Sequence, residues 1–228
     1  MGEQTVLRAK ICGIRTSEAA IAAAEGGADY LGFILAPSKR QVRIDDVAAI
    51  RGSLEEWQAR GVARRQPLLT AVVVNLNLPE LAAIAGSGAV DVIQLSGDET
   101  PEVLDELPVP IVKAVRVDPE RGEVEARRTI ESWLDRSRPA AGILLDAWHP
   151  SAFGGTGETA DWAVAARLAA DYPIWLAGGL TPANVGEAIA AVRPFGVDVS
   201  SGVEKDGVKD PALIRAFLER VRAPHVSL

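Results

Sequence analysis

Ile143-Leu144-Leu145-Asp146 is a short apolar run that ends on one carboxylate, and it leads into a glycine-rich segment at residues 154–157 (GGTG). The start of the chain repeats this arrangement at residues 9–13 (AKICG), where the run ends on a thiol. It recurs at residues 175–179 (WLAGG), where the run ends on two glycines. Parallel strands place their carboxyl ends at one edge, so we expect an acid, a thiol and a phosphate-binding loop to converge there.

Runs of this kind alternate with amphipathic stretches about eight times along the chain. Each run is mostly apolar on both faces, as a parallel strand covered by helices must be. Eight strand–helix units would have roughly 28 residues each, which is enough for a strand, a helix and two short loops. The sequence therefore predicts an α/β fold, a single-domain (β/α)8 TIM barrel over residues 1–228, with strands at residues 9–13, 30–35, 69–74, 90–95, 111–115, 142–146, 174–177 and 196–199.

Helical spacing between the strands predicts helices at residues 18–25, 79–85, 160–170, 182–192 and 211–221. Thr181 and Asp210 each precede a proline, so both are expected to cap a helix start. The charged segment at residues 52–66 is expected to be a solvated helix or loop that enlarges the second helical unit, and a surface extension is the alternative. A doubly wound open sheet is the alternative fold, but its Gly-x-Gly-x-x-Gly turn is missing after the first strand, where residues 12–15 read CGIR.

The composition suits a protein that binds a small ligand. The net charge of −7 and the pI near 5.0 disfavour a nucleic-acid partner. A single cysteine excludes an internal disulfide. The chain has no run of about 18 apolar residues and no secretory signal at its start, so we expect a cytoplasmic protein with no membrane partner.

Cys12 and Asp146 are the candidate proton-transfer residues. A thiol at the end of the first strand faces the barrel mouth, where the nearby Lys10 would favour the thiolate and so a general base. A buried structural cysteine is the alternative. An unpaired carboxylate at the end of the sixth strand would be partly desolvated, which raises its pKa and lets it deliver a proton. Asp146 could instead cap the following loop.

Two glycine loops are the candidate phosphate site. Gly178 and Gly179 follow the seventh strand, and Ser201 and Gly202 follow the eighth, where barrels commonly bind phosphate through backbone amides. Two tight turns with no ligand-binding role are the alternative, because they would contain the same residues. Arg40, just beyond the second strand, has a planar guanidinium suited to a carboxylate, although a surface arginine is the alternative.

The glycines of residues 154–157 are a candidate lid hinge. Gly154, Gly155 and Gly157 would let the loop close over a ligand, and a plain flexible loop would show the same glycines. His149 and His225 have no metal-ligand spacing, so no metal site is expected.

Five groups of motifs, in order and over nearly the whole chain, match one known family. They are residues 10–13 (KICG); 32–33 with 37–40 (GF, PSKR); 144–146 with 154–157 and 161–162 (LLD, GGTG, DW); 177–180 (AGGL); and 197–204 (VDVSSGVE). In these motifs the chain resembles phosphoribosylanthranilate isomerase.

The resemblance implies a tryptophan-pathway enzyme without metal or organic cofactor. It would convert N-(5-phosphoribosyl)anthranilate to 1-(2-carboxyphenylamino)-1-deoxyribulose 5-phosphate by an Amadori rearrangement. The resemblance assigns Asp146 as the acid that opens the furanose ring and Cys12 as the base that removes the C2′ proton. It places Arg40 on the anthranilate carboxylate and Asp198 near the ribose hydroxyls. The expected partner is this small phosphorylated substrate, and the protein is expected to be a monomer or homodimer.

Departures from the family pattern leave two alternatives. Many relatives have Gln-Leu-His-Gly where this chain has Ser96 in place of the histidine, and they have Phe-Val-Asn where residues 73–75 read VVN. The first alternative, a catalytically silent phosphate-sugar binder, is motivated by Ser96. The second is the related bisubstrate aminoaldose phosphate isomerase, which needs an aspartate where this chain has Cys12.

Overall fold

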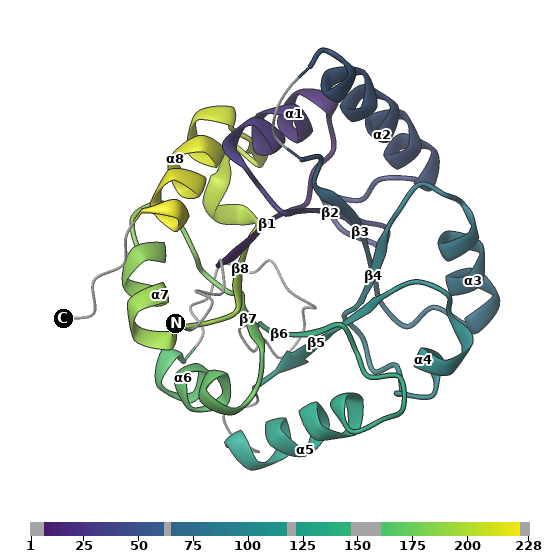
Figure 1. Ribbon diagram of the computed structural model, residues 1–228, viewed down its shortest axis with the longest axis vertical. Coiled ribbons are helices and arrows are strands. Elements are labelled where there is room, and N and C mark those ends of the chain that lie inside the picture. The colour runs from purple at the N-terminus through teal and green to yellow at the C-terminus, as the bar shows by residue number, and fades with distance from the viewer. Residues whose placement is uncertain (1–6, 62–64, 118–121, 147–160, 224–228) are drawn as a thin grey trace.

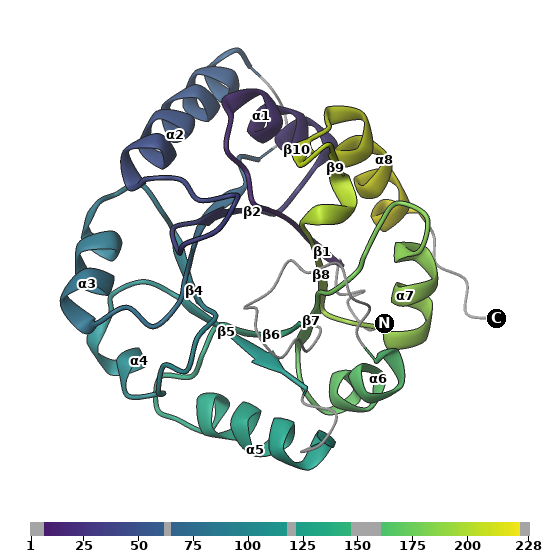
Figure 2. The same cartoon turned by 180° about the vertical axis from the view of Figure 1, so that it is seen from behind.

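The computed structural model describes residues 7–61, 65–117, 122–146 and 161–223, and its centre is a closed barrel of eight parallel strands (Figures 1 and 2). Each strand pairs with its neighbour in chain order, and the first closes the ring by pairing with the eighth. The predicted TIM barrel is confirmed. The strands are β1 (Arg8–Cys12), β2 (Tyr30–Ile34), β3 (Leu68–Val73), β4 (Val92–Leu95), β5 (Ile111–Arg116), β6 (Gly142–Asp146), β7 (Ile174–Leu176) and β8 (Gly196–Val199).

A helix follows each strand, and the helices form a ring around the barrel (Figure 1). They are α1 (Ser17–Gly26), α2 (Ile44–Ala59), α3 (Leu78–Gly86), α4 (Val103–Glu106), α5 (Gly122–Leu134), α6 (Trp162–Asp171), α7 (Val185–Val192) and α8 (Pro211–Arg222). Between β8 and α8 lie a short 3-10 turn, η1 (Ser201–Val203), and an antiparallel hairpin of β9 (Glu204–Lys205) and β10 (Val208–Lys209). This hairpin rises from the carboxyl end of the barrel, so it belongs to the end where the strands deliver their side chains.

The two predicted caps have different outcomes. The Asp210 carboxylate accepts hydrogen bonds from the first turn of α8, so this cap is confirmed. Thr181 does not cap a helix, because α7 begins only at Val185. Thr181 and Asn184 instead exchange two hydrogen bonds, between each backbone N–H and the other side chain, and so form a turn before the helix.

For residues 52–59 the expected enlargement of the second helical unit is confirmed, and the alternative of a surface extension is wrong. Residues 52–59 form the end of α2, and Leu54 and Trp57 of this part are buried in the main core. The charged residues lie on the other side of the same helix. The charge density of this segment therefore did not reveal its buried face, because a helix can be solvated on one face and packed on the other.

Apolar side chains fill two separate cores. The larger core lies between strands and helices, and the smaller one fills the barrel interior around Leu144, Trp175 and Ala177. Tyr30 and Phe195 pack edge-on against the Trp175 ring, with ring centroids 5.1 and 5.8 Å away. These aromatic rings close the barrel at the strand starts, so a ligand site is left only at the carboxyl ends. No helix in the described ranges is both long and apolar enough to span a membrane.

Candidate active site

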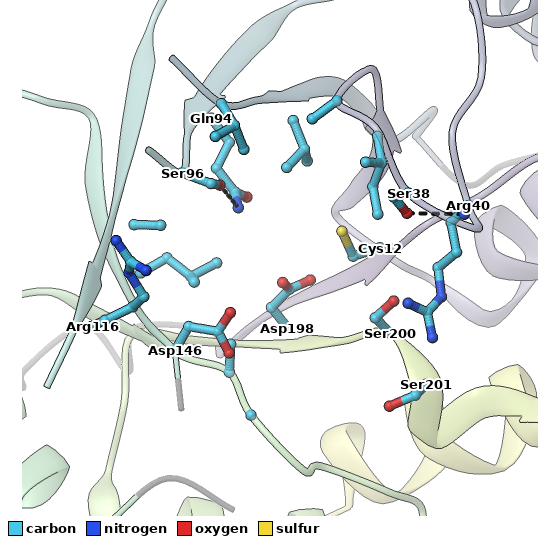
Figure 3. Close-up of a pocket in the computed structure, with 18 of the residues that line it drawn as sticks. Cys12, Ser38, Arg40, Gln94, Ser96, Arg116, Asp146, Asp198, Ser200 and Ser201 are labelled. Atoms are coloured by element: carbon cyan, nitrogen blue, oxygen red, sulfur yellow. Dashed lines mark hydrogen bonds between the residues drawn. The ribbon is translucent and has the colours of Figure 1, made fainter. Parts of the chain in front are cut away.

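A pocket opens at the carboxyl ends of the strands, and most of the residues singled out in the sequence line it. Figure 3 shows side chains from β1, β4, β5, β6 and β8 pointing into this space. The lining includes the expected residues Cys12, Arg40, Asp146, Gly178, Gly179, Asp198 and Ser201. Segments that are far apart in the sequence therefore meet at one cavity, as the parallel barrel requires.

Cys12 ends β1 with its side chain turned into the barrel and only 6% of the residue exposed. Space for the sulfur comes from Gly32 of the neighbouring strand, since a Cβ there would lie 2.7 Å from the Cys12 Sγ. The Lys10 ammonium lies near the thiol and donates a hydrogen bond to Asp198 Oδ1 at 3.1 Å. The ammonium thus connects the thiol to a carboxylate across the β1–β8 pairing.

The protonation of Cys12 differs from the expectation. Burial raises the pKa of the thiol, and the Asp198 charge raises it further, while Lys10 and Lys209 lower it by less. Lys10 therefore favours the thiolate, as predicted, but burial outweighs it and the thiol pKa lies above its usual value in the protein without a ligand. Lys10 itself stays charged, because burial lowers its pKa by less than Asp198 and Cys12 raise it.

Asp146 ends β6 half-buried, and its carboxylate points into the pocket on the other side of Asp198 from Cys12 (Figure 3). Its partner in the parallel ladder is Arg116, the last residue of β5, whose guanidinium also reaches the pocket. The sequence reasoning missed Arg116. A signal for it was present, because β5 ends on a polar residue just as β6 does.

Arg40 is buried, and its guanidinium is already held by a protein carboxylate. Arg40 Nε and Nη2 donate to the two oxygens of Glu204 at 2.6 and 2.9 Å. Lys209 Nζ donates to the same carboxylate at 2.8 Å. The alternative of a surface arginine is excluded, since the Arg40 side chain is only 5% exposed. The sequence reasoning assigned no role to Glu204 or Lys209, both of which lie on the β9–β10 hairpin.

Hydrogen bonds from Arg40 and Lys209 make Glu204 a strong acid. Burial alone would raise the pKa of this carboxyl, but the two cations outweigh burial and lower the pKa to about 2. Burial also lowers the pKa of Lys209, more than the Glu204 carboxylate raises it. The cluster therefore contains an ionised carboxylate throughout the neutral pH range.

The two glycine loops lie side by side on the pocket wall. Gly178 and Gly179 have φ of 89° and 64°, in the left-handed region that favours glycine. Ser201 lines the same wall, and Gly202 packs behind it, where a Cβ would collide with the Leu180 carbonyl oxygen. The loops after β7 and β8 are thus in direct contact and expose backbone toward the cavity, as a phosphate site requires.

Ser96 lies in the upper part of the pocket and accepts a hydrogen bond from Gln94 Nε2 at 3.1 Å. Its loop is held by Glu99, which accepts hydrogen bonds from the backbone N–H groups of Asn75 and Gly97 at 2.7 and 3.0 Å. Lys113 donates to Glu99 at 2.8 Å. Ser96, which is smaller than the histidine of many relatives, therefore lies on a loop that these hydrogen bonds hold in place.

Several expectations fall on parts of the chain that the structure does not describe. The candidate lid glycines Gly154, Gly155 and Gly157 and both histidines, His149 and His225, lie outside the described residues. Within the described ranges, no group of three or more His, Cys, Asp or Glu side chains could hold a metal ion.

Comparison with known proteins identifies similar chains. The sequence model of a family described as N-(5′phosphoribosyl)anthranilate (PRA) isomerase matches residues 9–220. A relative of that name from Roseiflexus sp. (strain RS-1) is 44% identical over 219 residues, which cover 96% of this chain and 99% of the relative. The crystal structure of phosphoribosyl anthranilate isomerase from Thermotoga maritima is similar, with a TM-score of 0.77, 32% identity and coverage of 95% and 98% of the two chains.

A further similar structure contains a ligand. It is a phosphoribosyl anthranilate isomerase in complex with reduced 1-(o-carboxyphenylamino)-1-deoxyribulose 5-phosphate, with a TM-score of 0.74 and 31% identity. The match covers 95% of this chain and 98% of that one. The similarity therefore extends over almost the whole barrel, including the strand ends that form the pocket.

Proposed function

Because the chain belongs to the N-(5′-phosphoribosyl)anthranilate isomerase family, we propose that it is an aldose–ketose isomerase of tryptophan biosynthesis. The reaction converts N-(5′-phosphoribosyl)anthranilate to 1-(2-carboxyphenylamino)-1-deoxyribulose 5-phosphate. One observation supports this function above the others: a thiol and a carboxylic acid lie on different walls of one pocket that also has two glycine loops. An aldose–ketose rearrangement needs a proton donor and a proton acceptor on one substrate.

Asp146 is the proposed general acid. Its position on the β6 wall faces the centre of the pocket, where a sugar ring would lie. Its proton passes to the furanose ring oxygen, the C1′–O bond breaks, and the lone pair of the anthranilate nitrogen forms the C1′=N bond. The product of this step is an open-chain iminium ion that carries one positive charge.

Cys12 is the proposed general base for the second step. It removes the proton from C2′, and the electrons of the C–H bond form the C1′=C2′ bond and neutralise the iminium nitrogen. The resulting enolamine tautomerises to the aminoketone. A thiol with a raised pKa needs help to act as a base, and the iminium charge supplies it, because a nearby cation lowers a thiol pKa.

The remaining pocket residues hold the substrate in this proposal. The phosphate is bound by the backbone amides of Gly178, Gly179 and Gly202 and by Ser201. Arg40 binds the anthranilate carboxylate. Asp198 lies near the ribose hydroxyls while it keeps Lys10 in place. Gly154, Gly155 and Gly157 stay predicted as a lid hinge.

Loss of anthranilate fluorescence tests the function directly. Freshly formed phosphoribosylanthranilate is mixed with the purified protein, and the product, an isomer of the same mass, is identified after borohydride reduction as reduced 1-(2-carboxyphenylamino)-1-deoxyribulose 5-phosphate. We expect loss far above the spontaneous rate. Binding of the reduced product analogue without turnover would instead indicate the silent binder, and turnover of the histidine-pathway aminoaldose phosphate would indicate the bisubstrate enzyme.

The assembly and location of the protein remain proposals. We expect one domain over residues 1–228, a cytoplasmic enzyme and either a monomer or a homodimer, without nucleic-acid or membrane partners. A solved Thermotoga maritima relative is described as dimeric, which supports the homodimer as one of the two possibilities. Light scattering at enzyme-assay concentrations would distinguish them.

A further inference from the structure

Arg40, Glu204 and Lys209 form a buried cluster at the edge of the pocket. Their side chains are 5%, 6% and 3% exposed. Glu204 takes both the bidentate contact from Arg40 and the ammonium of Lys209, whose Nζ also donates to the Ser200 carbonyl at 2.8 Å. Neither Glu204 nor Lys209 lines the pocket, whereas Arg40 does.

The backbone fixes the position of this cluster from two sides. Glu204 and Lys209 are cross-strand partners in the β9–β10 hairpin, so their spacing is set by the hairpin. Arg40 lies on the loop after β2 and crosses directly over Gly13, where a Cβ would be 2.7 Å from the Arg40 Cδ. Gly13 has a φ of 80°, so a glycine suits both the backbone and the close approach of the arginine.

The guanidinium has a second edge that remains available. Glu204 uses the Nε–Nη2 edge, and in the described part of the chain no acceptor bonds to Nη1. A guanidinium has five N–H donors in one plane, so the Nη1–Nη2 edge fits another carboxylate while Glu204 stays bound. In Figure 3 the guanidinium of Arg40 lies beside Ser200, at the same side of the pocket as Cys12.

We propose that Glu204, held in turn by Lys209, is a positioning residue that sets the orientation of Arg40 and thereby gives the site its preference for a carboxylated aromatic amine. This inference rests on the proposed function, since it deepens the assignment of the anthranilate carboxylate to Arg40. Glu204 touches no substrate. It acts by fixing one edge of the guanidinium so that the other edge meets the ligand.

Charge supports the same assignment. Two cations share one carboxylate, so the cluster carries one net positive charge in a buried place. A buried charge without a counter-ion is unfavourable, and an anionic ligand group would supply that counter-ion. If Glu204 served only to neutralise Arg40, the second cation would not be needed beside it.

Two ligands that differ by one group test the proposal. The first is reduced 1-(o-carboxyphenylamino)-1-deoxyribulose 5-phosphate, and the second is the same molecule without the carboxyl group. Calorimetry gives the dissociation constant of each, and their ratio reports the carboxylate contact alone. In the unmodified protein we expect the carboxylated ligand to bind about 10- to 100-fold more tightly, as for a charged hydrogen-bonded pair.

Glu204→Gln should reduce this ratio to the level of Arg40→Ala, while the affinity for the ligand without the carboxyl group stays within about twofold of its original value. In steady-state kinetics KM should rise more than kcat falls. The double variant Glu204→Gln/Lys209→Met removes one anion and one cation together, so the net charge of the cluster is unchanged. No additional unpaired charge is then buried, so this variant should fold even where Glu204→Gln alone does not. It should lose the preference as well. Lys205→Gln, an exposed residue of the same hairpin, is the matched control and should change nothing.

The results of these experiments distinguish failure of the positioning role of Glu204 from failure of the proposed function. If Arg40→Ala lowers the ratio but Glu204→Gln and the double variant leave it unchanged or increase it, the positioning role is overturned and the proposed function stands. Equal weakening of both ligands in a folded Glu204 variant would also overturn it, since that pattern indicates general damage to the pocket. If Arg40→Ala does not lower the ratio, Arg40 is not the carboxylate anchor, and the inference fails with it. Absence of isomerase activity in the unmodified protein would instead refute the proposed function itself.

Discussion

Lys10 is one of several charged residues whose charges set the protonation of the Cys12 thiol. Its ammonium contacts both Cys12 and Asp198, and all three side chains are buried. Burial and Asp198 raise the pKa of Cys12, whereas Lys10 and Lys209 lower it. The protonation of the thiol is therefore a balance of nearby charges and can be moved in either direction.

Lys10→Met should raise the pKa of Cys12 further, because it removes the nearest stabilising cation of the thiolate. Asp198→Asn should lower the pKa, because it removes an anion that disfavours the thiolate. The rate of alkylation by iodoacetamide as a function of pH measures the thiolate, and Cys12 is the only cysteine of the chain. A shift in the same direction in both variants would contradict this balance of charges.

The contact between Arg40 and Glu204 could not be predicted from the sequence. Arg40 and Glu204 are 164 positions apart, and neither residue has a local pattern that announces the other. Cys12 and Asp146 could be found because each ends an apolar strand on a lone polar group. Arg116 had the same signal and was overlooked. The raised pKa of Cys12 could not be foreseen, since burial and the Asp198 contact exist only in the folded barrel.

At the scale of elements, the loops after β3 and β4 are joined by one carboxylate. Glu99 bonds to the backbone of both loops and to Lys113, and its side chain is only 6% exposed. Asp98 is its natural comparison, because it neighbours Glu99 but its side chain is 74% exposed and its contact with Arg116 is 3.4 Å long.

Glu99→Ala should destabilise the fold by about 3 kcal/mol, because it leaves the buried Lys113 charge without its carboxylate partner. Asp98→Ala should cost less than about 1 kcal/mol, as for an exposed pair. Urea unfolding followed by tryptophan fluorescence gives both values. Equal stability of the two variants would show that Glu99 does not hold these loops.

The strands were easier to predict than the helices. Buried parallel strands are apolar on both faces, so every strand of the barrel appears as a short run in the sequence. Helix starts depend on capping contacts, and the Thr181–Asn184 turn shows that a threonine followed by a proline can begin a turn rather than a helix. Helix α5 was not foreseen, although it packs against β5 and buries Ile130 and Trp133 in the main core.

For the whole molecule, closure of the barrel depends on space for Trp175 at its centre. Gly196 provides this space, because a Cβ there would lie 2.6 Å from the indole ring. Gly186 of α7 makes a useful contrast, since nothing lies within 4 Å of its Cβ position. Alanine substitutions at these two glycines therefore distinguish the effect of barrel packing on stability from the effect of helix propensity.

Gly196→Ala should destabilise the protein by about 1–3 kcal/mol through overpacking against Trp175. Gly186→Ala should stabilise it by about 0.5 kcal/mol, because alanine is the better helix former. Thermal or urea unfolding of the two variants measures the difference. A stable Gly196→Ala protein would mean that the aromatic centre of the barrel can rearrange freely.

The division of proton transfer between Cys12 and Asp146 is the central claim, and one measurement tests it most directly. With enzyme in excess over phosphoribosylanthranilate, a single turnover is followed by the loss of fluorescence in the unmodified protein, in Cys12→Ser and in Asp146→Asn. The account predicts that each variant still binds the reduced product analogue but turns over at least about 100-fold more slowly, as the loss of a general acid or base requires. A folded variant of either residue that turns over at nearly the unmodified rate would contradict it.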